Sequence, residues 1–181
     1  NEYASGLTAL YQLKNIQTVL AAVDYLNHQQ FELNMNAVKE GLAEVCTITG
    51  LRGRWEKIAD KPLIIADTGH NVQGIQAVVQ QIGLTDAKTV HIIIGMVNDK
   101  DINGVLDILP TSALYYFTNA DVKRALPSNE LQQMATKYGL RGNAYSTVTL
   151  AIRDAKANAS EDDLILITGS NFVVGEALAL I

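Results

Sequence analysis

The sequence predicts an α/β fold in which a mostly parallel sheet is covered by helices on both faces. Short apolar runs that lack strict alternation recur along residues 51–181, and such runs are typical of strands buried on both faces. Segments with apolar residues at helical spacing separate the runs, and an alternation of strands and helices favours parallel pairing. We therefore expect about six strands, one of them antiparallel.

The expected strands are short and consist mostly of Ile, Leu, Val and Tyr. Residues 52–58 offer a further strand ahead of the first long run. Because each run is bounded by turn-forming or polar residues, the runs are assigned as separate strands. They lie at residues 63–66, 90–94, 114–117, a weaker 144–146, and 164–167.

The segments between these runs show helical periodicity. In the first of them, Ile75, Val78 and Ile82 fall on one face of a helix, and Gly139 is a stop signal for the third. With the strands, these helices predict a Rossmann-like arrangement. The expected helices cover residues 72–82, 101–109, 130–138, 148–159 and 172–180.

The first 50 residues show helical periodicity without strand signals. Residues 7–26 and 35–45 are expected helices, and Asn34 is the expected cap of the second. Two helices alone make a small core, so we expect residues 1–50 to be the end of a neighbouring domain and residues 51–181 to form the α/β domain. The chain also begins without methionine, in the middle of a pattern, which predicts a fragment of a longer protein.

Composition and charge exclude several classes of protein. Hydrophobic residues make up 48% of the chain, which excludes disorder, and no apolar run approaches the roughly 20 residues that span a bilayer. The formal net charge of −5 argues against nucleic acid as a partner. The single cysteine, Cys46, cannot form an internal disulfide, so we expect a reducing, cytoplasmic location without membrane contact.

Small and polar residues follow four of the expected strands. Ligands of open α/β sheets bind at the carboxyl ends of strands, so these loops predict a ligand site, although most α/β proteins have polar loops there. The chain lacks a G-x-G-x-x-G fingerprint, a phosphate loop, zinc-ligand spacing and a G-x-S-x-G elbow. Among the histidines, only His70 directly follows a strand, whereas His91 is expected in the core and His28 at a helix end. The loops are residues 67–71, 95–101, 118–121 and 168–171.

Four motifs in residues 51–181 resemble the C-terminal domain of the folylpolyglutamate synthase/dihydrofolate synthase family of the Mur ligase superfamily. Tyr11, Gln12 and Asn15 also resemble the Y-Q-x-x-N helix at the end of that family's central ATPase domain. The motifs occur in the family's order. They are G-R-W-E-K-I (53–58), I-I-A-D-T-G-H-N (64–71), G-M-V-N-D-K-D (95–101) and G-S-N-F-V-V-G-E (169–176).

The resemblance implies part of an ATP-dependent amide ligase of folate biosynthesis and one-carbon metabolism, active in polyglutamylation. Such enzymes phosphorylate a carboxylate of folate or dihydropteroate, and the amino group of L-glutamate then attacks the acyl phosphate. ATP and Mg²⁺ are the implied cofactors, with the phosphate loop and most magnesium ligands expected in the preceding ATPase domain. This chain alone is therefore expected to be inactive, and none of its residues is expected to bind metal.

The resemblance also implies roles for individual residues. Arg54 would bind the phosphates of ATP with its two-pronged guanidinium. Asp67 and His70 would be the catalytic residues, and Asp67 would either accept hydrogen bonds from the ribose or orient the site. His70 and Ser170 would contact glutamate at strand-to-helix junctions, where helix N-termini favour carboxylates.

Further residues are implied with less specific roles. Gln12 and Asn15 would face the adenine, whose edge an amide can match. Lys100 and Asp101 form a family motif without an assigned role. Structural alternatives are open for several of these residues, because Arg54 could pair with a glutamate, and Asp67 and Ser170 could each cap a helix.

Two other functions are open at this point. A peptidoglycan-precursor ligase of the Mur type also closes a C-terminal domain over ATP, although the G-R-W and G-S-N motifs favour the folate branch. A non-catalytic binding module of receiver or flavodoxin-like type is the alternative from another class. Such a module would need neither the helical prefix nor Arg54 ahead of its first strand.

Overall fold

The computed structural model describes residues 2–29 and 31–180. The chain forms two compact units that divide between Trp55 and Glu56. This division lies five residues beyond the expected boundary at residue 50, because the stretch that leads to the first strand belongs to the first unit. That the first unit is the end of an ATPase domain stays a prediction.

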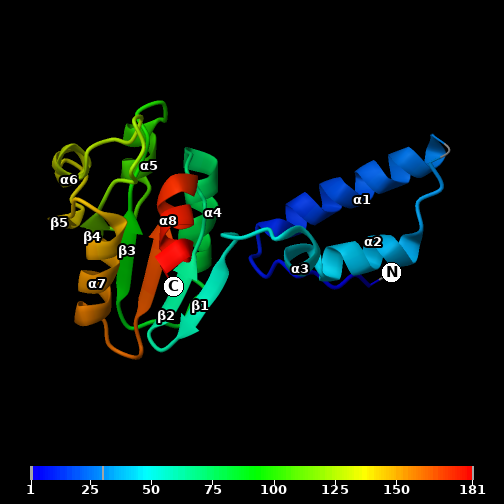
Figure 1. The fold of residues 1–181 in the computed structure, drawn as a ribbon, viewed down its shortest axis with the longest axis horizontal. Coiled ribbons are helices and arrows are strands. Elements are labelled where there is room, and N and C mark those ends of the chain that lie inside the picture. Colours follow the sequence, from blue (N-terminus) through cyan, green and yellow to red (C-terminus); the bar gives the residue numbers. More distant parts are fainter. Residues whose placement is uncertain (1, 30, 181) are drawn as a thin grey trace. The chain divides into compact units, whose positions relative to one another are not determined.

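The described part of the first unit contains three helices (Figure 1). Asn34 caps the second one as expected, since its side-chain oxygen accepts hydrogen bonds from two backbone N–H groups of the first turn. The first helix begins five residues later than expected. The third, which ends at Gly50 with a left-handed φ of 68°, was not expected. The helices are α1 (Gln12–His28), α2 (Met35–Ala43) and α3 (Val45–Thr49).

Several large apolar side chains of the first unit are exposed. Leu13 and Tyr25 on α1 are 57% and 65% exposed, and Ile48 on α3 is 61% exposed. Only apolar area that is removed from water stabilises a fold. The helices therefore bury little apolar surface by themselves, and their place at the end of a neighbouring domain stays a prediction.

The second unit is built on one sheet, which has six strands over residues 56–180 in the order β1-β2-β6-β3-β4-β5. Only β1 and β2 pair antiparallel, and the other neighbouring pairs are parallel. The expected mostly parallel sheet with one antiparallel strand is confirmed. The strands are β1 (Glu56–Asp60), β2 (Leu63–Ala66), β3 (Val90–Ile94), β4 (Leu114–Phe117), β5 (Arg141–Ala144) and β6 (Leu164–Thr168).

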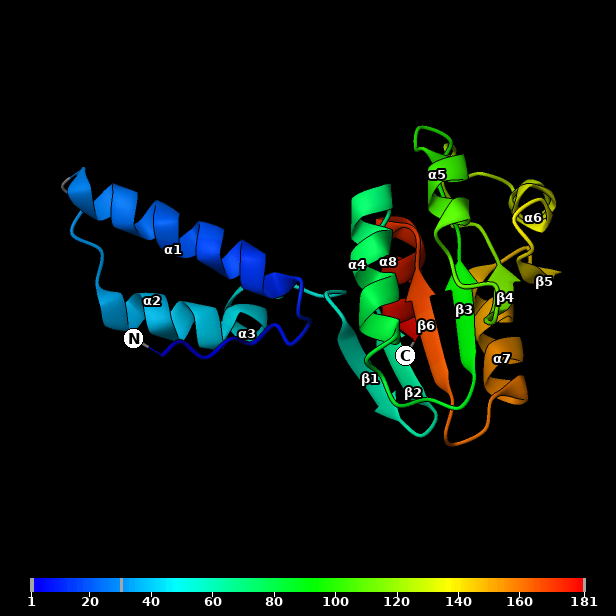
Figure 2. The ribbon, with the colours of Figure 1, turned by 180° about the vertical axis from the view of Figure 1, so that it is seen from behind.

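Helices cover both faces of this sheet (Figures 1 and 2). On β3, Ile93 packs toward the face covered by α7 and α8, whereas Ile92 and Ile94 pack toward the face covered by α4, α5 and α6. Neighbouring residues of one strand thus enter two different cores, as the alternation of side chains in a strand requires. The helices are α4 (Val72–Ile82), α5 (Ile102–Asp107), α6 (Ser128–Thr136), α7 (Val148–Asn158) and α8 (Asn171–Leu180).

The fifth strand differs from its expected position. β5 begins at Arg141, three residues before the weak run that was expected at residues 144–146. It lies at the edge of the sheet, where a strand needs few apolar residues. Gly142 is required there for a different reason, because a Cβ atom at this position would lie 1.8 Å from the carbonyl oxygen of Tyr115.

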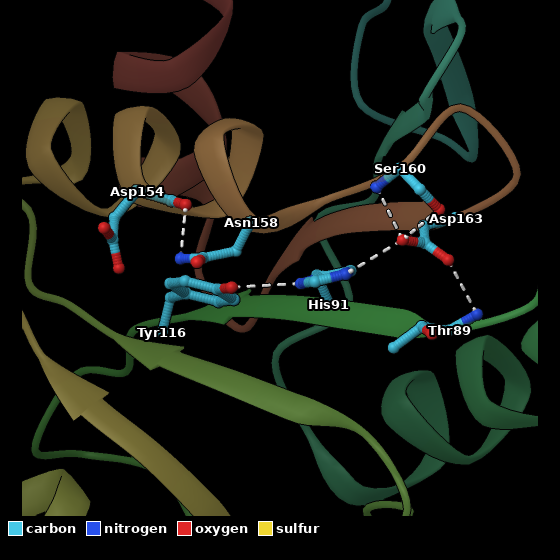
Figure 3. A network of polar contacts seen from close by, with 7 residues as sticks. All are labelled: Thr89, His91, Tyr116, Asp154, Asn158, Ser160 and Asp163. Carbon is cyan, nitrogen blue, oxygen red and sulfur yellow. Dashed lines mark hydrogen bonds and ion pairs between the residues drawn. The ribbon is translucent and has the colours of Figure 1, made fainter.

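A polar network crosses the interior near the amino ends of the strands (Figure 3). His91 on β3 is 1% exposed, which confirms its expected core position. Its Nε2 lies 3.5 Å from Oδ2 of Asp163, and its Nδ1 lies 3.0 Å from the hydroxyl of Tyr116. A carboxylate only accepts hydrogen bonds, so Nε2 is the ring nitrogen that would direct a proton toward Asp163, and Nδ1 is then placed to accept from the tyrosine hydroxyl.

Asp163 fixes the loop that precedes β6. Its Oδ2 accepts hydrogen bonds from the backbone N–H and the hydroxyl of Ser160 at 2.7 Å each, and its Oδ1 accepts from the N–H of Thr89 at 3.0 Å. These bonds, above all the one from the Ser160 backbone, lower the pKa of Asp163 from 3.8 to about 2. One ionised carboxylate therefore joins the loops that precede β3 and β6.

Candidate functional site

Four loops meet at the carboxyl edge of the sheet. The N–H of Gly169 and the hydroxyl of Thr168 both donate to the carbonyl oxygen of Gly69, at 2.9 Å and 3.3 Å, which joins the loops after β6 and β2. Between β3 and β4, the N–H of Thr118 donates to the carbonyl oxygen of Ile94 at 2.9 Å. The loops that sequence analysis selected as candidate ligand-binding segments therefore lie together.

Glycines at this edge allow the loops to pack against each other. A Cβ atom at Gly95 would lie 2.5 Å from the carbonyl oxygen of Thr118, and one at Gly169, whose φ is 92°, would lie 2.7 Å from that of Gly95. At Gly95 and Gly169 a side chain is excluded, because neighbouring backbone occupies the space that it would need.

Asp67 lies at the end of β2, in the loop that leads to α4. It is 3% exposed, and its Oδ1 accepts a hydrogen bond from the N–H of Gly69 at 2.8 Å. The alternative that Asp67 caps the following helix is wrong, because α4 begins at Val72 and the side chain of Asn71 caps it. The buried carboxylate instead shapes the turn that presents the next site residue.

His70 follows in the same turn and is half-buried. Its Nδ1 lies 2.9 Å from the carbonyl oxygen of Thr68. A carbonyl oxygen only accepts, so Nδ1 carries a proton, and whenever the ring is neutral the lone pair lies on Nε2. An imidazole held in this tautomer can accept a proton or a hydrogen bond from a ligand beside it.

Ser170 lies at the start of α8. It is 3% exposed, and its Oγ accepts a hydrogen bond from the N–H of Phe172 at 3.1 Å. The helix-capping alternative for Ser170 is therefore confirmed. Capping uses the oxygen as an acceptor, so the hydroxyl proton is still available as a donor to a ligand.

Lys100 and Asp101, which form one sequence motif, have different surroundings in the structure. Oδ1 of Asp101 accepts a hydrogen bond from the N–H of Gly104 at 2.9 Å and caps α5, so Asp101 has a structural role. Lys100 is half-buried and lines the same pocket as His70. The cap thus fixes the start of the helix directly after the lysine.

The pocket has a volume of about 140 Å³. His70, Lys100 and Ser170 line it, so the fold brings three of the predicted residues together. It also includes Arg124, which sequence analysis missed because it lies three residues beyond the selected loop at 118–121. Two permanent cations and the N-terminus of α8 make the pocket suitable for an anion. The remaining lining residues are Val97, Asn171 and Phe172.

The amino edge of the sheet carries the opposite charge. A larger hollow of about 480 Å³ lies there, and acidic side chains predominate in its lining. One of these acidic side chains, Asp163, accepts hydrogen bonds within the network of Figure 3. An anionic ligand is therefore favoured at the carboxyl edge and disfavoured at the amino edge. The charged residues lining the hollow are Asp60, Asp86, Glu161, Asp162, Asp163, Lys61 and Lys88.

Arg54 belongs to the first unit, next to the division between the units. The residues on either side of it, Gly53 and Trp55, both have left-handed backbone, with φ of 70° and 53°. Such a conformation is uncommon for a tryptophan and occurs more often at functional sites. Arg54 is half-buried, and its Nη1 donates to the carbonyl oxygen of Gly53 at 3.4 Å. Its binding to ATP stays a prediction.

Gln12 and Asn15 lie one turn apart at the start of α1. Nδ2 of Asn15 donates to Oε1 of Gln12 at 2.8 Å, and Gln12 is 3% exposed. Each amide thus orients the other, as residues three apart on a helix can. Their contact with adenine stays a prediction.

Within residues 2–29 and 31–180, no group of three or more His, Cys, Asp or Glu side chains is placed to hold a metal ion. No helix in the same part is long and apolar enough to cross a membrane.

Comparisons with known proteins place this geometry in a family. The family model of the Mur ligase, glutamate ligase domain, matches residues 53–171. The dihydrofolate synthase/folylpolyglutamate synthase of Escherichia coli is 27% identical over 169 residues, which cover 92% of this chain and 37% of that protein. The chain spans 20%, 38%, 42% and 37% of the length of four curated relatives.

Two solved structures show the same fold. Folylpolyglutamate synthase of Mycobacterium tuberculosis, complexed with ADP and AMPPCP, superposes with a TM-score of 0.83 at 26% identity and covers 97% of this chain and 41% of its own. A bifunctional folylpolyglutamate synthase/dihydrofolate synthase with Mn, AMPPNP and L-glutamate bound has a TM-score of 0.72 at 25% identity, over 88% of this chain and 38% of its own. The match of the family model spans more than half of the chain and includes the whole pocket except Phe172. The chain belongs to the family of the Mur ligase, glutamate ligase domain.

Proposed function

We propose that the chain is the C-terminal part of an ATP-dependent ligase that joins L-glutamate to folate or dihydropteroate through an acyl phosphate. The cationic pocket at the carboxyl edge, in a chain of the glutamate ligase domain family, carries this proposal. Relatives named folylpolyglutamate synthase favour a folate over a peptidoglycan precursor as the acceptor. The same membership argues against a receiver or flavodoxin-like module.

His70 acts at the step that forms the amide bond. The amino nitrogen of glutamate attacks the acyl carbon, a C–N bond forms, the C–O bond to phosphate breaks, and one proton leaves the nitrogen. The lone pair on Nε2 of His70 suits it to accept this proton, because the bond from Nδ1 to Thr68 fixes the tautomer. Asp67 is buried in the same turn and acts by positioning the imidazole.

The carboxylates of glutamate bind to the rest of the pocket. The ammonium of Lys100 supplies a point charge, and the hydroxyl of Ser170 supplies a donor directly before the N-terminus of α8. Free N–H groups at a helix N-terminus carry partial positive charge and favour carboxylates. This gives Lys100 a role in binding the incoming amino acid.

The residues proposed for ATP come mostly from the first unit. Arg54 bridges the phosphates, and Gln12 and Asn15 contact the adenine. Bound Mg²⁺ would neutralise charge on the phosphates. We propose that its ligands lie mostly in the preceding ATPase domain, and we assign no step of this chain to the metal.

We further propose that the reaction takes place in the cytoplasm, because it consumes ATP and L-glutamate. The decisive experiment uses the full-length protein that contains this chain. ADP release is measured with Mg-ATP and L-glutamate in the presence of dihydropteroate, a folate, or a peptidoglycan precursor. Release that requires both glutamate and a pterin substrate is expected. Release that requires the peptidoglycan precursor, or that ignores glutamate, would overturn the proposal.

A further inference from the structure

Two of the positive groups that line the pocket at the carboxyl edge belong to separate elements. The N-terminus of α8, which follows Ser170, is one of them, and Arg124, in the loop between β4 and α6 (residues 118–127), is the other. An anion that contacts both groups needs them at a fixed separation. That separation depends on the contacts that hold the β4–α6 loop.

The two ends of the β4–α6 loop are held by the domain itself. At its start, Ala120 is 3% exposed and packs into the core that α7 and α8 cover. Toward its end, the N–H of Asn98 donates to the carbonyl oxygen of Arg124 at 3.0 Å, and Val97 forms an antiparallel bridge with Ala125. Residues 121–123 lie between these two anchors and lead directly into the arginine.

One face of α8 contacts this part of the loop. Oε1 of Glu176 accepts a hydrogen bond from the N–H of Asp121 at 2.7 Å. One turn earlier on the helix, the ring of Phe172 lies 5.0 Å from the central carbon of the Arg124 guanidinium. Residues four apart share a face of a helix. Phe172 and Arg124 line the pocket, whereas Glu176 and Asp121 do not, so the hydrogen bond holds the loop from outside the pocket.

The charge of Glu176 does not suit an anion pocket. A carboxylate one helical turn from the lining opposes the binding of an anion through its negative charge. Its hydrogen bond to the loop, by contrast, favours binding if it keeps Arg124 in place. The two effects have opposite signs, which makes them separable by substitution. Glu176 also closes the G-S-N-F-V-V-G-E motif, of which the proposed function uses only the serine and the start of the helix.

We propose that Glu176 is a positioning residue for the binding of glutamate. By accepting from the N–H of Asp121 it fixes the β4–α6 loop against α8, and it thereby keeps Arg124 at the pocket. This inference rests on the proposed function, because it takes the pocket as the place where the carboxylates of glutamate bind. Glu176 itself contacts neither glutamate nor ATP.

Two substitutions of Glu176 in the full-length enzyme separate the hydrogen bond from the charge. One hydrogen bond shifts the equilibrium between a placed and a displaced loop by about two- to tenfold, and apparent affinity falls with the fraction that is placed. Glu176→Ala should therefore raise the KM for glutamate about two- to tenfold and leave the KM for ATP unchanged. Glu176→Gln keeps an accepting oxygen without the charge, so it should keep the KM for glutamate of the wild type or lower it.

A double variant tests whether the effect passes through the arginine. In an Arg124→Gln background, Glu176→Ala should change the KM for glutamate by less than about twofold, because no guanidinium is left to misplace. The inference would be overturned if Glu176→Ala left that KM unchanged or lowered it, with or without a lower Tm. An equal rise in the alanine and glutamine variants would also overturn it, as would effects of Glu176→Ala and Arg124→Gln that multiply.

The same measurements distinguish the inference from the proposed function. If the wild-type enzyme does not use glutamate, the proposed function fails and the inference fails with it. If the wild type uses glutamate and Glu176→Ala has the same KM for glutamate, only the inference fails.

Discussion

Replacing Asp163 by asparagine is expected to lower the free energy of unfolding of the second unit by about 2–3 kcal/mol at neutral pH. The change keeps the shape of the side chain but replaces one accepting oxygen by an NH₂ group. This group must face either the N–H of Ser160 or that of Thr89, so one donor loses its acceptor. A hydrogen bond to a charged group contributes about 1.5–3 kcal/mol, and the contact of the charge with His91 is lost as well.

The destabilisation should depend on pH in a defined sense. Folding lowers the pKa of Asp163 to about 2, below the value of about 3.9 expected in the unfolded chain, so the folded state favours the ionised form. Its stabilising contribution is complete above about pH 4 and is lost as the pH falls through the folded pKa. The difference between the wild type and Asp163→Asn should therefore narrow between about pH 4 and pH 2.

Thermal unfolding followed by circular dichroism at pH 7, 4 and 2.5 measures both effects. A loss of about 2–3 kcal/mol corresponds to a decrease in Tm of roughly 6–12 °C for a unit of this size. Asp162→Asn is the matched control, because it removes the same charge from an exposed neighbour, where changes are usually within about 0.5 kcal/mol. The reasoning would be refuted if the free energy of unfolding fell equally in the two variants. It would also be refuted if the decrease in Asp163→Asn stayed the same from pH 7 to pH 2.5.

Three further outcomes are expected. The purified chain should release no ADP with Mg-ATP, glutamate and dihydropteroate, because no phosphate loop occurs in its sequence; glutamate-dependent release from a preparation free of contaminating ligase would contradict this. In the full-length enzyme, His70→Ala should raise the KM for glutamate about ten- to a hundredfold and the KM for ATP much less. His28→Ala, at an exposed position, is the control. A raised KM for ATP with an unchanged KM for glutamate would show that His70 does not contact glutamate. Arg54→Ala should lower kcat/KM for ATP at least about a hundredfold, and Arg54→Lys should lower it more than about tenfold. Near-normal activity of Arg54→Lys, or a lower Tm of Arg54→Ala, would contradict the role of Arg54 in binding phosphate.

The central strands could be predicted because their residues pack into two hydrophobic cores, one on each face of the sheet. Ile92, Ile93 and Ile94 are all fully buried, although they point to alternate faces of the sheet. Only an uninterrupted apolar run meets this requirement, and such a run is visible in the sequence. For the same reason β2, β3 and β4 have the predicted limits, and β6 extends one residue further.

Elements that do not face two cores were harder to predict. β5 contains Arg141, Gly142 and Asn143, and only its pairing with β4 makes it a strand. The glycine is required by the nearby backbone of Tyr115, a contact between residues far apart in the sequence. The short helix α3 likewise has no buried residue, so no apolar face marked it.

The site could be predicted wherever a motif lies directly after a strand. His70, Lys100 and Ser170 meet this condition and line one pocket. Arg124 does not, because the loop after β4 continues for several residues before it turns back to pair with residues 96–98. The pairing that returns the arginine to the pocket is a contact across the fold, and local sequence patterns carry no signal for it.

The strand order explains why these separate loops make one pocket. β6 is the last strand in the chain, yet it lies between β2 and β3 (Figure 2). Its position places Ser170 and the N-terminus of α8 between His70 on one side and Lys100 and Arg124 on the other. Had β6 been added at an edge of the sheet, the helix terminus would lie outside the group of cations. The partial charge of the helix terminus and the charges of the two side chains would then act at separate places. The position of β6 inside the sheet therefore gathers the helix terminus and the cations into one pocket.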